Sequence, residues 1–138
     1  MLFGLKRVAD NYMQIWNADS EGMLDVFADK NLVVEYTHFE KVEGIENYKK
    51  FLQTFYHSFP DLKVNIAEII LNKKDESATV FWNYSGTHQN DKIFGVEPAG
   101  KKIVVNAMSY LKFKNKKVIY EKGIVDNLSL LMQLNPNN

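Results

Sequence analysis

The sequence lacks cysteine altogether and has a single arginine, Arg7, among its 17 basic residues. Without cysteine, the chain has no disulfide framework, thiolate nucleophile or cysteine-ligated metal. Arginine is the residue that holds phosphate and carboxylate groups through paired hydrogen bonds, so its scarcity disfavours a phosphate-recognising function. The three histidines, His38, His57 and His88, do not have the spacing of a zinc site, so no metal is expected.

Excess charge and long apolar runs are absent as well. The 17 basic and 17 acidic residues cancel, which disfavours non-specific binding to nucleic acid or to an acidic membrane surface. No window approaches the roughly 18 apolar residues that a membrane-spanning helix needs. The N-terminal "MLFGLKRVAD" is too poor in apolar residues for a secretion signal. We therefore expect a cytoplasmic protein without nucleic-acid or membrane partners.

The length and the aromatic content favour one domain with an internal pocket. The 138 residues correspond to a single domain, 1–138, large enough for a core and a modest cavity. Aromatic residues make up 13% of the chain. Because a few large rigid rings can enclose a volume, this content is typical of a ligand pocket.

The hydrophobic periodicity predicts helices first and strands later. Apolar residues at helical spacing predict helices over 5–17 and 44–59, with a short helix between them capped by Asp19 or Ser20. Period-two patterns and β-branched residues predict strands over 31–39, 62–71, 77–88, 101–113 and 118–126. The apolar tail 127–134 is expected to form a final turn against the body. This order predicts an α+β fold, a mostly antiparallel curved sheet wrapped around three helices like a cone with one open mouth.

The stretch "FWNYSGTHQNDKIFGVEPAGKKI", residues 81–103, predicts one wall of that pocket. Side chains alternate along its first half, so Trp82, Tyr84, Gly86 and His88 share one face. We expect this face to line the cone, with Gly86 leaving room for ligand or for strand curvature.

Asp126 is the first candidate for acid/base chemistry. It follows the last strand and precedes the apolar tail. If its carboxyl group pointed into apolar surroundings, its pKa would rise and it could exchange protons near neutral pH. The alternative is a helix cap, which aspartate also forms well.

Three further polar residues could reach the same cavity. His88 could shuttle a proton at the pocket mouth or lie half in water at a strand end. His38 could approach from another wall, although a histidine at a strand end is commonly at the surface. Lys122 shares strand parity with Asp126 if no bulge intervenes, and it could face the carboxyl group or the solvent.

Four segments in order along the chain resemble the SnoaL-like polyketide cyclase family of the NTF2-like superfamily. The first, "WNADSEGMLDVFA", has the W-N pair before a short acidic helix, and "GIENYKKFLQTFYHSFPDLKVNIAEII" has the Gly-initiated helix that ends in F-P-D-L. The stretch 81–103 has G-T-H and a G-x-x-P-x-G-K loop, and "IVDNLSLLMQL" has the D-x-L-x-L-L-x-Q-L ending.

The resemblance implies a cone-shaped, usually dimeric α+β barrel. Characterised cyclases of this family close a ring by intramolecular aldol condensation without metal or cofactor, using an aspartate before the terminal L-x-Q-L segment as the general acid/base. Asp126 occupies that position here, and His88 matches the histidine of G-T-H. Dimerisation could use a sheet face that includes the outward Phe81.

The leading hypothesis is a cofactor-free cyclase, or a related lyase or isomerase, acting on a small apolar carbonyl compound. Asp126 would remove a proton beside the carbonyl group, and His88 would stabilise the enolate oxygen. The alternatives are a non-catalytic protein that binds an apolar ligand, and a ketosteroid-isomerase-like enzyme with Tyr12 or Tyr84 as a second donor. The residues expected to line the pocket are Tyr12, Trp16, Tyr36, His38, Phe55, Trp82, Tyr84, Phe94, Met108 and Lys122.

Overall fold

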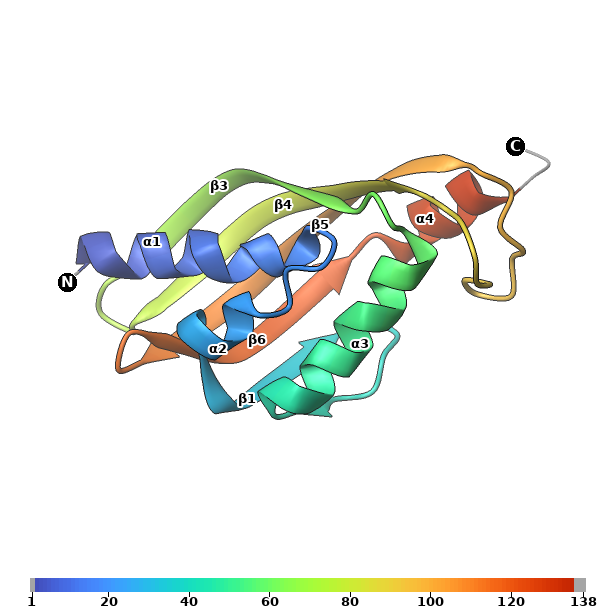
Figure 1. The fold of residues 1–138 in the computed structure, drawn as a ribbon. Coiled ribbons are helices and arrows are strands. Elements are labelled where there is room, and N and C mark those ends of the chain that lie inside the picture. The colour runs from blue at the N-terminus through green and yellow to red at the C-terminus, as the bar shows by residue number, and fades with distance from the viewer. Residues whose placement is uncertain (1, 136–138) are drawn as a thin grey trace.

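The computed structural model describes residues 2–135, which form helices over one face of a curved sheet (Figure 1). The helices are α1 (Leu2–Met13), the 3-10 helix η1 (Gln14–Trp16), α2 (Met23–Phe27), α3 (Ile45–Ser58) and α4 (Asn127–Leu134). The strands are β1 (Ala28–Tyr36), β2 (Val42–Glu43), β3 (Lys63–Asn72), β4 (Ser77–Thr87), β5 (Lys102–Lys114) and β6 (Lys117–Val125).

The strands form one sheet in the order β2-β1-β6-β5-β4-β3. Neighbouring strands run antiparallel, except β1 and β6, which run parallel. Helices α1, α2 and α3 lie on the concave face, whereas α4 follows β6 at the far end of the sheet (Figure 1). The predicted α+β architecture is confirmed.

Several local predictions are wrong. Helix α2 has Gly22 at its N-cap and no side-chain cap, so neither Asp19 nor Ser20 caps it. The first strand spans Ala28–Tyr36 and ends before His38, whose φ of 70° turns the chain away. The tail is a complete helix rather than a turn, because Asp126 caps α4. The two-residue strand β2 was not predicted.

The alternation predicted for β4 is confirmed. Trp82, Tyr84, Gly86 and His88 are all buried, and the residues between them are only partly buried. The space in front of Gly86 is filled by the protein itself, since an added Cβ would lie 3.0 Å from the Cβ of Phe59. Gly86 therefore makes room for Phe59, not for a ligand.

The same alternation divides β5 between the two faces of the sheet. Val105, Ser109 and Leu111 point into the core and are at most 1% exposed. Val104 and Met108 point outward and are 56% and 42% exposed. The sheet therefore has one face packed against the helices and one apolar face turned to solvent.

Candidate functional site

Asp126 lies at the surface, where β6 ends and α4 begins. Its carboxylate accepts a hydrogen bond from the Ser129 backbone N–H at 3.0 Å, and the residue is exposed. The expectation that Asp126 points into an apolar chamber is therefore wrong, and the helix-cap interpretation is confirmed. Its catalytic role stays a prediction without an enclosed site to support it.

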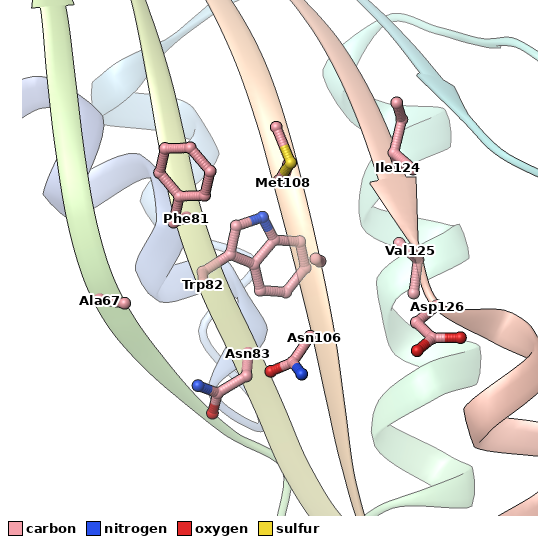
Figure 2. Close-up of a pocket in the computed structure, with 10 residues that line it drawn as sticks. Ala67, Phe81, Trp82, Asn83, Asn106, Met108, Ile124, Val125 and Asp126 are labelled. Carbon is pink, nitrogen blue, oxygen red and sulfur yellow. The ribbon is translucent and has the colours of Figure 1, made fainter.

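A depression of about 370 Å³ on the outer face of the sheet has Asp126 at one end. Figure 2 shows Phe81 and Asn83 from β4, Asn106 from β5 and Ile124 from β6 around it. Asp126 is the only ionisable residue among those that line this depression. This depression thus contains no second acid or base to work with Asp126, although Lys101 and Lys102 line a neighbouring depression on its other side.

Three predicted pocket residues do not face the interior. His38 is exposed in the turn after β1, where its backbone has left the strand. Met108 and Lys122 are exposed on the outer face, because the inward positions of β5 and β6 are the neighbouring Ser109, Glu121 and Gly123. The expectation that these three side chains line the cone is wrong.

The structure does bring together the predicted aromatic residues. Trp16 is the centre of the cluster, with its ring centroid 5.7 Å from that of Tyr36, 5.2 Å from Phe55, 5.1 Å from Trp82 and 5.5 Å from Tyr84. All five side chains are buried. They fill the base of the cone with rings in contact and not with an open cavity.

A buried carboxylate, Glu121, lies beneath this aromatic cluster. It accepts hydrogen bonds from the hydroxyl groups of Tyr12 at 2.5 Å, Tyr36 at 2.5 Å and Ser109 at 2.7 Å. The Tyr48 hydroxyl lies 3.5 Å from the same carboxylate and donates to the Tyr36 oxygen at 3.3 Å. We call these five residues the Glu121 centre.

Burial and hydrogen bonding act in opposite directions on Glu121. Its side chain is completely inaccessible to solvent, and this desolvation raises its pKa above the ordinary value of 4.5. The hydroxyl donors lower the pKa and offset only part of the rise. Burial raises the pKa of Tyr12, Tyr36 and Tyr48 well above 10, so these phenols keep their protons. The centre combines a carboxyl group that protonates more readily than usual with neutral donors.

The backbone of β6 positions this centre. Gly123 pairs with Tyr36 on β1, and an added Cβ would lie 2.0 Å from the Tyr36 ring. The glycine lets the Tyr36 ring lie flat against β6 and reach Glu121, two residues away on the same face. Opposite, the Trp82 indole N–H donates to the Ser109 hydroxyl at 2.9 Å, which leaves the Ser109 proton for Glu121.

Sequence reasoning missed Glu121 because it set the parity of β6 from Asp126, which it took to face inward, and a bulge earlier in the strand hides the true parity. The register between β5 and β6 shifts between Lys112 and Phe113, so both Val118 and Glu121 point inward although three positions separate them. An unbroken alternation from Val118 places Tyr120 and Lys122 inward and Glu121 in solvent. The available signal was Gly123, since a glycine in a strand marks a close approach by a neighbouring group.

A second pocket lies at the mouth of the cone, next to the loop 89–100. It measures about 300 Å³, and we call it the mouth pocket. Its lining residues come from the turn after β1, from α3 and from the loop: Phe39, Phe51, Thr54, Phe55, Ser58, Asp91, Lys92, Ile93 and Phe94. Phe55 and Phe94 were predicted here, and the structure places both in the lining. Inward from the mouth, Phe51 stacks on the Tyr36 ring with centroids 6.5 Å apart.

His88 is buried between the mouth pocket and the core. Its Nε2 lies 2.6 Å from the Asp91 carbonyl oxygen, which can only accept, so Nε2 carries the proton. In the neutral ring, Nδ1 is then an acceptor and cannot donate to an enolate oxygen. Nδ1 has no hydrogen-bond partner among the described residues. Within residues 2–135, no group of three or more His, Asp or Glu side chains could hold a metal ion.

A curved sheet with three helices over its concave face and an aromatic interior defines a cone-shaped α+β domain of the NTF2-like type. The sequence model of the SnoaL-like polyketide cyclase family matches residues 6–134, and the chain belongs to this family. The family suggests an enzyme of the lyase or isomerase type. No curated protein sequence matches the chain significantly. No helix within the described residues is long and apolar enough to span a membrane.

Solved structures share this fold over nearly the whole chain. A candidate polyketide cyclase from Acidithiobacillus ferrooxidans has a TM-score of 0.81 at 19% identity, covering 95% of this chain and 94% of that one. TsrD from Streptomyces laurentii has a TM-score of 0.82 at 16% identity, covering 95% of this chain and 94% of that one. AclR from Streptomyces galilaeus, described as a candidate hydroxylase, has a TM-score of 0.82 at 19% identity, covering 97% of this chain and 86% of that one. At these identities the neighbours establish the fold and not the reaction.

Proposed function

We propose that the protein catalyses proton transfer beside a carbonyl group in a small, largely apolar compound, leading to ring closure or isomerisation. The observation that carries this proposal is the Glu121 centre, a solvent-free carboxyl group with a raised pKa at the base of an aromatic cone. Buried carboxyl groups whose pKa lies closer to neutrality are suited to general acid/base catalysis. Membership of a cyclase family supports the reaction class.

Tyr36 connects Glu121 to the mouth pocket. It donates to the carboxylate, and its ring stacks on Phe51, which lines the mouth. In the proposed step, the C–H bond beside the carbonyl breaks and its proton passes to the Tyr36 oxygen, while the Tyr36 proton passes to Glu121. The electron pair moves to the carbonyl oxygen as an enolate. Attack of the enolate carbon on a second carbonyl group closes a ring, and the proton returns from Glu121 through Tyr36 to the new alkoxide oxygen. When the proton returns to another carbon of the enolate instead, the product is an isomer.

The experiment measures exchange of carbon-bound hydrogen for deuterium in 2-tetralone, a small bicyclic ketone, by proton NMR in D₂O. The folded wild-type protein should accelerate exchange over buffer. Glu121→Gln and Tyr36→Phe should each lose about 10²–10⁴-fold of this acceleration, the usual contribution of a general acid/base. Asp126→Asn is the matched control, because asparagine caps a helix as well as aspartate does but carries no charge.

Two results would contradict the proposal. If Asp126→Asn abolished exchange and Glu121→Gln retained it, the acid/base would be the surface aspartate. If the wild-type protein bound 2-tetralone but caused no exchange, the alternative of a non-catalytic binding protein would take its place. Circular dichroism of each variant shows that the fold has been kept.

We also propose that two copies of the chain pair through the outer face of the sheet. This face presents Val104, Met108, Tyr110 and Ile124, which are 56%, 42%, 38% and 55% exposed. Side chains of this kind gain free energy when they are covered. A second copy of the chain is a suitable occupant because the net charge is zero, so two copies do not repel each other.

A further inference from the structure

Two buried polar atoms, one on the inner face of β4 and one directly after its end, lack partners among the described residues. The Tyr84 hydroxyl and the Nδ1 atom of His88 make no hydrogen bond within residues 2–135, although their residues are 1% and 0% exposed. A buried polar group without a partner is costly, because it has lost its hydrogen bonds to water, and native structures contain few of them. The pair lies outside the Glu121 centre, so the proposed proton transfer does not account for it.

The two atoms have complementary chemistry. Burial raises the pKa of Tyr84, so its phenol keeps the proton and can donate it in a hydrogen bond. His88 uses its Nε2 proton for the Asp91 carbonyl oxygen, which leaves the Nδ1 lone pair to accept a hydrogen bond. The Tyr84 hydroxyl can therefore donate to an acceptor such as a carbonyl oxygen, and His88 Nδ1 can accept from a donor such as a hydroxyl group.

Both atoms lie directly behind the mouth pocket. Phe55 lines this pocket, and its ring centroid is 6.0 Å from that of Tyr84. Phe59 follows at 6.0 Å from Phe55 and lies 5.7 Å from the His88 ring. Phe55 and Phe59 thus form the wall between the mouth pocket and the two unpartnered atoms, so a ligand from the mouth reaches these atoms only when the two rings turn aside. A planar ring can then stack on them.

The loop at the mouth is tied to the same histidine. His88 holds Asp91 through its side chain, and its backbone bonds to Lys101 and Gly100 at the other end of the loop. Phe94 in this loop has a φ of 49°, an unfavourable conformation for an aromatic residue, and its ring lies 6.3 Å from Phe39 across the mouth. Such strain is often found in segments that contact a ligand.

We infer that Tyr84 and His88 form an oxygen-binding subsite for a planar compound with a ketone at one end and a hydroxyl group at the other. Tyr84 donates to the ketone oxygen, and His88 Nδ1 accepts from the hydroxyl group. Four residues along a strand span about 13 Å, so the two oxygens belong to opposite ends of a two-ring skeleton. The assignment of a carbonyl compound rests on the proposed function; the subsite itself rests on the two unpartnered atoms.

The test compares three probes by titration calorimetry with the full chain: 6-hydroxy-2-acetylnaphthalene, 2-acetylnaphthalene and 2-naphthol. The wild-type protein should bind the first most tightly. Tyr84→Phe should weaken binding of the two acetyl compounds about tenfold, the effect of one lost hydrogen bond, and leave 2-naphthol unchanged. His88→Gln keeps a donor for the Asp91 carbonyl and should weaken only the two hydroxyl compounds. Tyr110→Phe on the outer face is the matched control and should change nothing.

The inference is overturned if none of the probes binds, or if Tyr84→Phe weakens all three equally. Tyr84→Phe removes a single oxygen from a packed ring, so this variant should still fold. Its binding to the three probes therefore tests the subsite even if His88→Gln fails to fold. Binding by Glu121→Gln separates the two proposals. Normal binding by this variant, with or without exchange activity in the wild-type protein, supports the subsite independently of the proton-transfer mechanism.

Discussion

Hydroxyl groups, and no cation among the described residues, stabilise the charge of Glu121. Tyr12, Tyr36 and Ser109 all donate to the carboxylate, and the Trp82 indole orients Ser109. Buried charges in proteins are normally paired or fully hydrogen-bonded, because removing them from water is costly. Even so, the donors do not fully offset the desolvation, since the Glu121 pKa remains raised.

The raised pKa predicts how stability depends on pH. A carboxyl group whose pKa is higher in the folded state binds protons more tightly there, so its stabilising contribution is fully present below the unfolded-state pKa. The contribution is lost as pH rises through the folded-state pKa of Glu121. The free energy of unfolding of the wild-type protein should therefore fall, relative to Glu121→Gln, as pH rises from about 4. Urea titrations of both proteins over this range check it, and parallel pH profiles would be inconsistent with a raised pKa.

Gly123 supports the centre through the absence of a side chain. A Cβ at this position would lie 2.0 Å from the Tyr36 ring, so Gly123→Ala must displace that ring or the strand. We expect a loss of about 1–3 kcal/mol of stability, typical of overpacking, together with loss of exchange activity. Gly22→Ala is the control, because an added Cβ there meets nothing within 4 Å. Equal stability of the two variants in thermal unfolding would contradict the packing argument.

Among the elements, α4 depends on the cap at its first turn. Asp126 accepts from the Ser129 N–H, and the helix that follows contacts β5 through Gln133, which bonds the Val104 backbone at 2.8 and 2.9 Å. Asp126→Ala should cost about 1 kcal/mol of stability, whereas Asp126→Ser should retain most of it. Chemical denaturation measures both. If serine proved as destabilising as alanine, the carboxylate would be stabilising the protein by some means other than capping.

The strands show what the sequence could and could not predict. In β4 the alternation is unbroken, so the inward positions of Trp82, Tyr84 and His88 followed directly from parity. In β6 Lys122 and Asp126 share parity as predicted, but both face outward, so the assumption that Asp126 faced inward made Lys122 look like a pocket residue and left Glu121 in solvent. A register shift between Val118 and Tyr120 means that counting from the buried Val118 gives the same wrong parity. Helix and strand positions come from local patterns that the sequence displays. A bulge depends on the partner strand, which the local pattern does not report.

For the whole molecule, the apolar outer face predicts self-association. Sedimentation equilibrium should give twice the chain mass of 16.0 kDa for the wild-type protein. Met108→Lys places a charge in the centre of the proposed contact and should shift the protein to monomer. Val26→Lys, at a position on α2 that is 60% exposed, is the control and should leave the mass unchanged. A wild-type protein that sediments as a monomer would remove the dimer proposal and leave the interior site untouched.

The described part of the chain is a cone closed by its own aromatic side chains around the buried carboxyl group of Glu121. The most direct test of that claim is a pH titration of the Glu121 side-chain carboxyl carbon by ¹³C NMR, assigned by comparison with Glu121→Gln. The account predicts a midpoint above the ordinary glutamate value of 4.5. A midpoint at or below that value would show a carboxyl group that is solvated or fully compensated, and would contradict the proposed acid/base role.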